Sequence, residues 1–129
     1  MFYRVFRDAV LLLALLLGAN SHAAPPVAPK GSLVIIGGGL RGDNAAVWSR
    51  IVHLAGGQGA RIAVFGAASA NPKNAGDTNV ARLNGYGAKA FSVPIASDTL
   101  AAADDAQLAD AIRQSGGAYF AGGDQARIT

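Results

Sequence analysis

Short apolar runs alternate with helix-like patterns along most of the chain. Ser32–Ile36 is an uninterrupted aliphatic run that ends at three glycines. The helical pattern after it has its apolar residues on one face: Val47, Trp48, Ile51, Val52 and Ala55. A run that is apolar at every position is typical of a strand covered on both faces. We therefore expect a buried strand over Ser32–Ile36, followed by a helix that is capped by Asp43 and stopped by the glycine pair Gly56–Gly57.

The same alternation continues further along the chain. Three more segments are expected to be strands: Arg61–Ala67, Lys89–Val93 and Ala118–Ala121. Helical patterns separate them, a weak one over about residues 77–83 and a stronger one that opens at Asp104–Asp105 and ends at Gly116–Gly117. Strands that alternate with helices indicate a parallel sheet with right-handed crossovers. The expected fold class is therefore α/β.

The first 23 residues have the pattern of an export signal. Two arginines precede an uncharged, Leu-rich run over Ala9–Ala19, and small residues follow at Ser21 and Ala23. This run is shorter than the roughly 20 apolar residues that span a bilayer, and its charged, apolar and small-residue segments follow the order of a secretory signal. We expect residues 1–23 to be cleaved and the protein to be secreted or periplasmic. The alternative is an anchor that stays in the membrane.

The segment after this signal is rich in proline. Residues 24–30 include three prolines, and Pro-rich segments are extended and semi-rigid, so they are expected to form a tether. The remaining stretch, residues 31–129, is expected to be the folded part. Its last helical pattern, after Asp124, holds little more than one turn, which is unstable alone. We expect the N-terminal part of a larger domain; the alternative is a naturally small one.

Composition removes several classes of function. The chain has no cysteine, which leaves zinc–thiolate sites and disulfides out. Its two histidines are His22, in the expected signal, and His53, so no metal site is expected. The net charge is +3 and the basic residues are scattered singly, without the basic stripe that nucleic acid requires.

Glycines at Gly37–Gly42 fit the pattern G-x-G-x-x-G between an expected strand and an expected helix. Such a loop can present backbone N–H groups to a dinucleotide at a helix N-terminus. The fingerprint also needs an acidic residue about 20 positions further on, and none lies between Asp43 and Asp77. A Rossmann-like nucleotide-binding module remains an alternative, and so does a tight turn whose glycines serve packing alone.

Two other loops follow expected strands. Ser69 lies in the first, but its neighbours do not form the G-x-S-x-G elbow of a nucleophilic serine, so we interpret it as a loop or capping residue. The second is Gly122–Gln125, which places two glycines at the carboxyl end of a strand. Backbone N–H groups there could form an oxyanion hole. A plain turn capped by Asp124 is the structural alternative.

Four blocks of the sequence together resemble cyanophycinase, a branch of the serine peptidases that includes the aspartyl dipeptidases. They are Gly37–Gly39, Ala67–Ser69, Tyr86–Gly87 and, most specifically, Tyr119–Ile128. The resemblance covers roughly residues 31–129. It implies a three-layer α/β sandwich with a mostly parallel sheet, flavodoxin-like or class I glutamine amidotransferase-like, of which this chain holds a truncated part.

The resemblance also implies an activity and a site. The family hydrolyses the β-Asp-Arg polymer cyanophycin to dipeptides by serine acyl transfer, without a cofactor. The oxyanion and substrate side would include Gly38, Gly39, Gly123, Asp124 and Gln125. The serine elbow, histidine and acid of the family are not recognisable here and are expected beyond Thr129, so the chain alone is expected to be inactive.

The expected partner is therefore cyanophycin or another isoaspartyl peptide, with no nucleic acid and no membrane after signal cleavage. A homodimer of the full-length protein is left open. A non-catalytic exported binding domain is the third functional class that the sequence allows, beside the hydrolase and the nucleotide-binding module.

Overall fold

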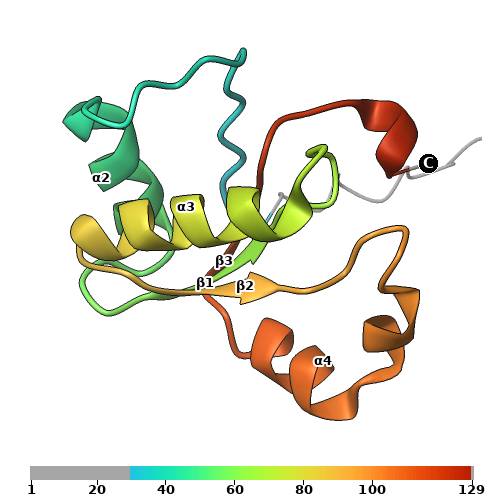
Figure 1. The fold of residues 1–129 in the computed structure, drawn as a ribbon. Helices are drawn as coiled ribbons and strands as arrows, with labels where there is room; N and C mark the ends of the chain where they lie inside the picture. Colours follow the sequence, from blue (N-terminus) through green and yellow to red (C-terminus); the bar gives the residue numbers. More distant parts are fainter. Residues whose placement is uncertain (1–29, 129) are drawn as a thin grey trace, which may run out of the picture. The chain divides into compact units, whose positions relative to one another are not determined.

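A three-stranded parallel sheet forms the centre of the fold (Figure 1). The computed structural model describes residues 30–128. Within them the strands are β1 (Arg61–Phe65), β2 (Lys89–Val93) and β3 (Gly117–Phe120). Their order is β2-β1-β3, with β1 in the middle. The α/β class expected from the sequence is confirmed, in the form of a small open sheet consistent with a truncated flavodoxin-like domain.

Helices cover both faces of this sheet. Figure 1 shows α2 (Ala45–Leu54) and α3 (Pro72–Gly85) on one face and α4 (Ala106–Arg113) on the other. The chain moves from β1 to β2 through α3, and then back past β1 to β3 through α4. Two right-handed crossovers in opposite directions must use opposite faces of a sheet. The three layers therefore follow from the strand order.

Polar side chains set the start of each helix. The N-caps are Asn44, Asn71 and Asp105, and each accepts a hydrogen bond from a backbone N–H of the first turn. The expectation that Asp43 caps the first helix is wrong: its carboxylate instead pairs with Arg41. Helix α3 begins earlier than the weak pattern over 77–83 indicates. Pro72 can stand at its first position because a backbone N–H there would have no acceptor within the helix.

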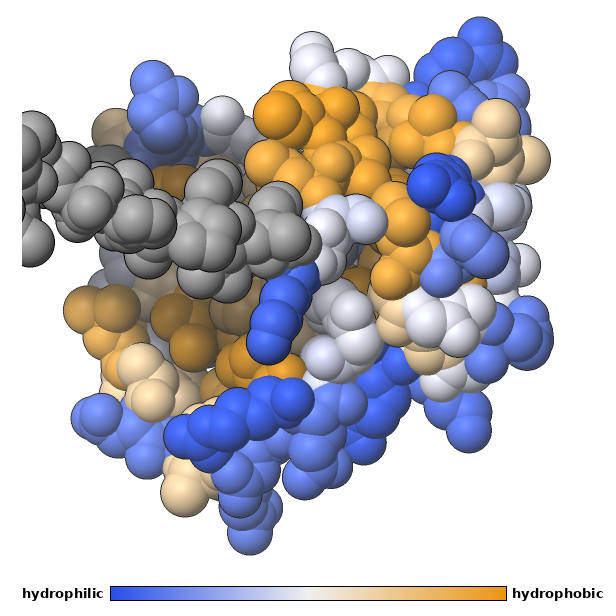
Figure 2. Space-filling model, turned by 180° about the vertical axis from the view of Figure 1, so that it is seen from behind, coloured by the Kyte–Doolittle hydropathy of each residue, from blue (hydrophilic) through white to orange (hydrophobic). Residues whose placement is uncertain are grey.

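The apolar run Ser32–Ile36 is not a strand, which corrects the sequence-based expectation. Both sides of β1 are occupied, by β2 and by β3, so the run has no place beside the central strand. It lies extended, and no backbone hydrogen bond joins it to the rest of the described chain. Leu33 and Ile35 are 84% and 86% exposed. Hydrophobic side chains gather on the face drawn in Figure 2.

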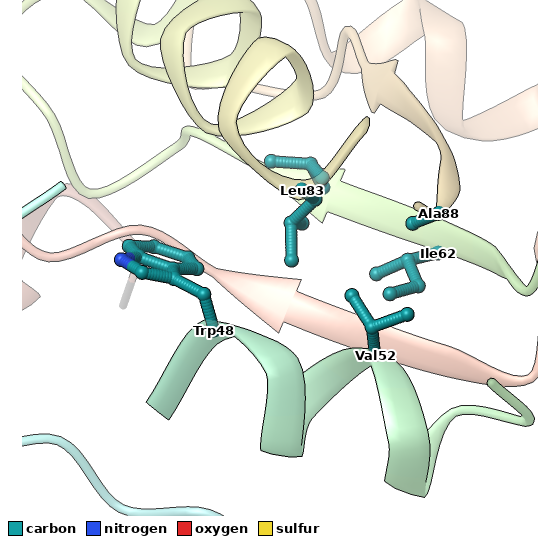
Figure 3. Packing of buried hydrophobic residues seen from close by; sticks show 6 residues of the cluster. Trp48, Val52, Ile62, Leu83 and Ala88 are labelled. Atoms are coloured by element: carbon teal, nitrogen blue, oxygen red, sulfur yellow. The ribbon is translucent and has the colours of Figure 1, made fainter. Parts of the chain in front are cut away.

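The core lies between the sheet and the pair of helices α2 and α3 (Figure 3). Its fully buried members come from all three elements: Trp48, Ile62, Val64 and Leu83. Leu40, from the loop before α2, also packs against this cluster. Because α4 has no fully buried residue, the opposite face of the sheet is covered less completely.

The expected signal, residues 1–23, and residues 24–29 of the expected tether lie outside the described residues. A search of residues 30–128 finds no helix with the length and apolarity needed to cross a membrane.

Leu83 provides a test of this core. Leu83→Ala removes a side chain that is 0% exposed and leaves a cavity against Trp48 and Ile62. We expect the free energy of unfolding to fall by about 2–5 kcal/mol. Leu100→Ala is the matched control at a residue that is 64% exposed, where the change should stay within about 0.5 kcal/mol. Urea unfolding of both variants measures this, and equal losses would contradict the core assignment.

Candidate functional site

Two loops meet at the carboxyl edge of the sheet. One follows β1 and leads to α3, and the other follows β3 and leads to the short 3₁₀ helix η2 (Gln125–Arg127). Backbone hydrogen bonds join them: Ala121 N–H donates to the Phe65 carbonyl at 2.8 Å, and Asp124 N–H donates to the Ala68 carbonyl at 2.9 Å. Parallel strands end at the same edge, so neighbouring loops are brought together as expected.

Gly123 is required by the closeness of this contact. A Cβ atom at position 123 would overlap the carbonyl group of Ala68 and the backbone nitrogen of Ser69. A Cβ atom at Gly122 would meet nothing within 4 Å. The two adjacent glycines thus differ: Gly123 lets two backbones touch, while Gly122 faces open space.

The N–H groups of Gly122 and Gly123 donate to no acceptor within residues 30–128. Their neighbours on both sides, Ala121 and Asp124, are tied to the first loop, which fixes the direction of the segment between them. Fixed and unused backbone donors at a strand end are what an oxyanion hole requires. The two donors are therefore available to an acceptor that lies outside the described residues.

Asp124 and Gln125 follow directly. The Asp124 side chain accepts a hydrogen bond from Ala126 N–H at 3.0 Å and so caps η2. Gln125 is the first residue of η2 and is engaged in an interaction of its own. The expected helix after Asp124 is thus a single 3₁₀ turn within the described chain.

Ser69 belongs to the first loop and is a loop residue, as expected. Its hydroxyl oxygen accepts a hydrogen bond from Asn71 N–H at 3.1 Å, and Asn71 in turn caps α3. Its part is to order the turn before the helix. No glycine elbow surrounds it.

The glycine loop Gly37–Gly42 does not share these backbone bonds. Its far end is held by two aromatic side chains: the Trp48 indole N–H donates to the Arg41 carbonyl at 2.9 Å, and the Tyr86 hydroxyl donates to the Gly42 carbonyl at 3.2 Å. Gly38 and Gly39 are exposed, have positive φ angles of 84° and 60°, and have open space where a Cβ would be. No strand precedes this loop, so the context that the dinucleotide fingerprint needs is missing from residues 30–128.

The charged side chains near the glycine loop Gly37–Gly42 are partly paired. Arg41 donates two hydrogen bonds to Asp43, at 3.0 and 2.7 Å, and this lowers the pKa of the Asp43 carboxyl below its ordinary value. The Arg82 guanidinium lies over the Trp48 ring, with its central carbon 5.2 Å from the ring centroid. Burial raises the pKa of Tyr119, and the positive charge of Arg82 opposes that rise.

Sequence reasoning included Ala68 in the block Ala67–Ser69 but gave it no role in the site, and it did not single out Arg82. Ala68 contributes only its carbonyl oxygen, and its one signal in the sequence is the run of small residues Gly66–Ala70, which permits a close approach. Arg82 occurs in a weak helical pattern, and nothing in the sequence places it beside Trp48. Both acquire their position from tertiary contacts.

Comparison with known proteins does not identify this chain. No family model matches it, and no solved structure matches it significantly.

Gly123→Ala tests the contact between the two loops. The new Cβ must push the Ala68 carbonyl away, and such overpacking typically costs about 1–3 kcal/mol of unfolding free energy. Gly122→Ala, one residue earlier, has room for its methyl group and should change stability little. Urea unfolding, with hydrogen exchange at the Asp124 amide, distinguishes them. Indistinguishable variants would mean that the loops do not touch in solution.

Tyr119 should make stability depend on alkaline pH. Because burial raises its pKa in the folded state, Tyr119 contributes stability that is present below the unfolded pKa, about 10, and is lost as pH rises through the higher folded pKa. Tyr119→Phe should flatten this alkaline loss. Melting temperatures of both proteins over the alkaline range provide the measurement, and parallel curves would be contrary to the expectation.

Proposed function

We propose that this chain forms the oxyanion and substrate side of an exported serine hydrolase that cleaves isoaspartyl peptide bonds, with cyanophycin as the substrate. The observation that carries the proposal is the pair of unused N–H groups at Gly122 and Gly123, held in place by Ala68. The resemblance of Tyr119–Ile128 to cyanophycinase supports the choice of substrate.

The chemistry requires donors that are in place before reaction. When a serine hydroxyl attacks a peptide carbonyl, the carbonyl oxygen becomes an oxyanion, and the proton of the serine passes to a base. Two backbone N–H groups at the position of that oxygen lower the barrier because they need no reorganisation. The serine, histidine and acid would come from residues outside 30–128, since no described serine lies in a nucleophile elbow.

Asp124 and Gln125 would line the substrate side of the same edge. The Asp124 carboxylate is exposed and uses one oxygen to cap η2, so it can also accept a hydrogen bond from the guanidinium of a β-Asp-Arg unit. Gln125 would donate or orient beside the oxyanion. Gly38 and Gly39 would lie near the substrate, as the resemblance implies.

The two alternative functions, a nucleotide-binding module and a non-catalytic binding domain, make different predictions. A nucleotide-binding module needs the Gly37–Gly42 loop at the end of a strand, and the run before it is unpaired. A non-catalytic binding domain would bind isoaspartyl peptides, and no protein encoded by a reading frame that contains this chain would hydrolyse them. Activity measurements therefore separate it from the hydrolase.

Gln125→Ala tests the proposal in the longest reading frame that contains this chain. Loss of one oxyanion donor typically lowers turnover about a hundred- to a thousand-fold, and we expect that range for cyanophycin with the melting temperature nearly unchanged. Gln107→Ala, at an exposed glutamine in the first turn of α4, is the control and should keep its turnover. Normal turnover with a lowered melting temperature in Gln125→Ala would reduce its role to that of a helix-start residue.

A further inference from the structure

Arg82 differs from every other lysine and arginine that the structure describes. It is partly buried, whereas the others within residues 30–128 are exposed. Its guanidinium lies over the ring of Trp48, which is itself 0% exposed. On another side it contacts the backbone of Gly42, where a Cβ atom would come within 2.9 Å of the Arg82 Nε atom. These two contacts place the cation between the Trp48 ring and Gly42.

No acceptor within residues 30–128 uses the N–H groups of this guanidinium. Three other basic side chains of the described chain have carboxylate partners: Arg41 pairs with Asp43, Lys73 with Asp77 and Arg113 with Asp110. The remaining ones have no salt bridge within residues 30–128, but they are exposed to water, whereas Arg82 is partly buried. Arg82 forms no salt bridge and no side-chain hydrogen bond there. A guanidinium carries five N–H donors in a rigid plane. Removing such a group partly from water without an acceptor is unfavourable.

The positive charge of Arg82 also acts on Tyr119, which contacts the Trp48 ring. Trp48 contacts Tyr119 with a centroid distance of 5.7 Å, and Arg82 acts electrostatically on the Tyr119 hydroxyl. The nearest acidic residue in sequence to the Gly42 contact, Asp43, is already paired with Arg41. This leaves a positive site with no carboxylate of its own among the described residues.

We propose that Arg82, placed between the Trp48 ring and Gly42, binds the carboxylate of a small organic acid. The planar fork of a guanidinium matches a carboxylate through two parallel N–H···O bonds. An arginine whose guanidinium already contacts an aromatic ring loses less side-chain freedom on binding than a fully exposed one, so more of the interaction energy appears as affinity. The site is formed by α2, α3 and the loop before α2, and it stands independently of the proposed hydrolase.

The structure contains its own reporter for this binding. Trp48 is the single tryptophan of the chain and lies directly under the Arg82 guanidinium. A carboxylate that pairs with Arg82 changes the electric field at the indole ring. Its fluorescence should therefore shift in a saturable way as the acid is added.

The experiment titrates the full chain with succinate and follows Trp48 emission. Sodium chloride at equal ionic strength and succinamide, the uncharged analogue, are the ligand controls. Three variants are compared: Arg82→Lys, which keeps the charge without the planar fork, Arg82→Gln, which removes the charge, and Arg50→Gln, which removes an exposed arginine on α2.

We expect saturable binding of succinate to the wild-type chain and to Arg50→Gln, and at least about tenfold weaker binding to both Arg82 variants. The fluorescence should not respond to succinamide or to chloride. A wild-type chain that shows no saturable response would overturn the proposal. So would equal succinate affinity in Arg82→Lys, which retains the cation–π contact and so preserves the packing on Trp48, or an equal response to chloride.

Discussion

The burial of Trp48 is the constraint on which the rest of the structure depends. This side chain comes from α2, packs with Leu83 of α3 and contacts Tyr119 of β3, so one residue joins both helices of one face to the sheet. Burying an indole also requires an acceptor for its N–H, and the Arg41 carbonyl provides it. The glycine loop is therefore held by the core, through a hydrogen bond that the core itself needs.

The position of β1 connects this core to the candidate site. Ile62 and Val64 of β1 are buried in the core, and the loop after the same strand presents the Ala68 carbonyl to the loop after β3. A strand paired on both sides is held in register along its length. The carboxyl end of β1 is therefore held in place. Its Phe65 carbonyl and the Ala68 carbonyl of the following loop accept hydrogen bonds from the residues on either side of Gly122 and Gly123. The oxyanion site that we propose would use backbone geometry and would need no titratable side chain.

Much of the fold could be predicted from local pattern. Lys89–Val93 was expected as a strand with its observed bounds, because Pro94, which cannot donate to a ladder, marks its end. Asp105 was expected to open a helix and does cap α4. The Gly122–Gln125 turn was expected at a strand end and is found there. In each case the information lies within a few neighbouring residues.

What the sequence alone determined is the parallel α/β class, because alternating runs and helical patterns depend on local chemistry. Ser32–Ile36 was expected to be a strand like the other segments, yet it is unpaired, and the two sides of β1 are occupied by β2 and β3. Strand order is decided by which segments compete for one edge, and no single segment contains that information. The Ala68 contact with Gly123 and the placement of Arg82 over Trp48 likewise join residues far apart in the chain. Only the tertiary structure decided them, since each depends on how separate elements pack together.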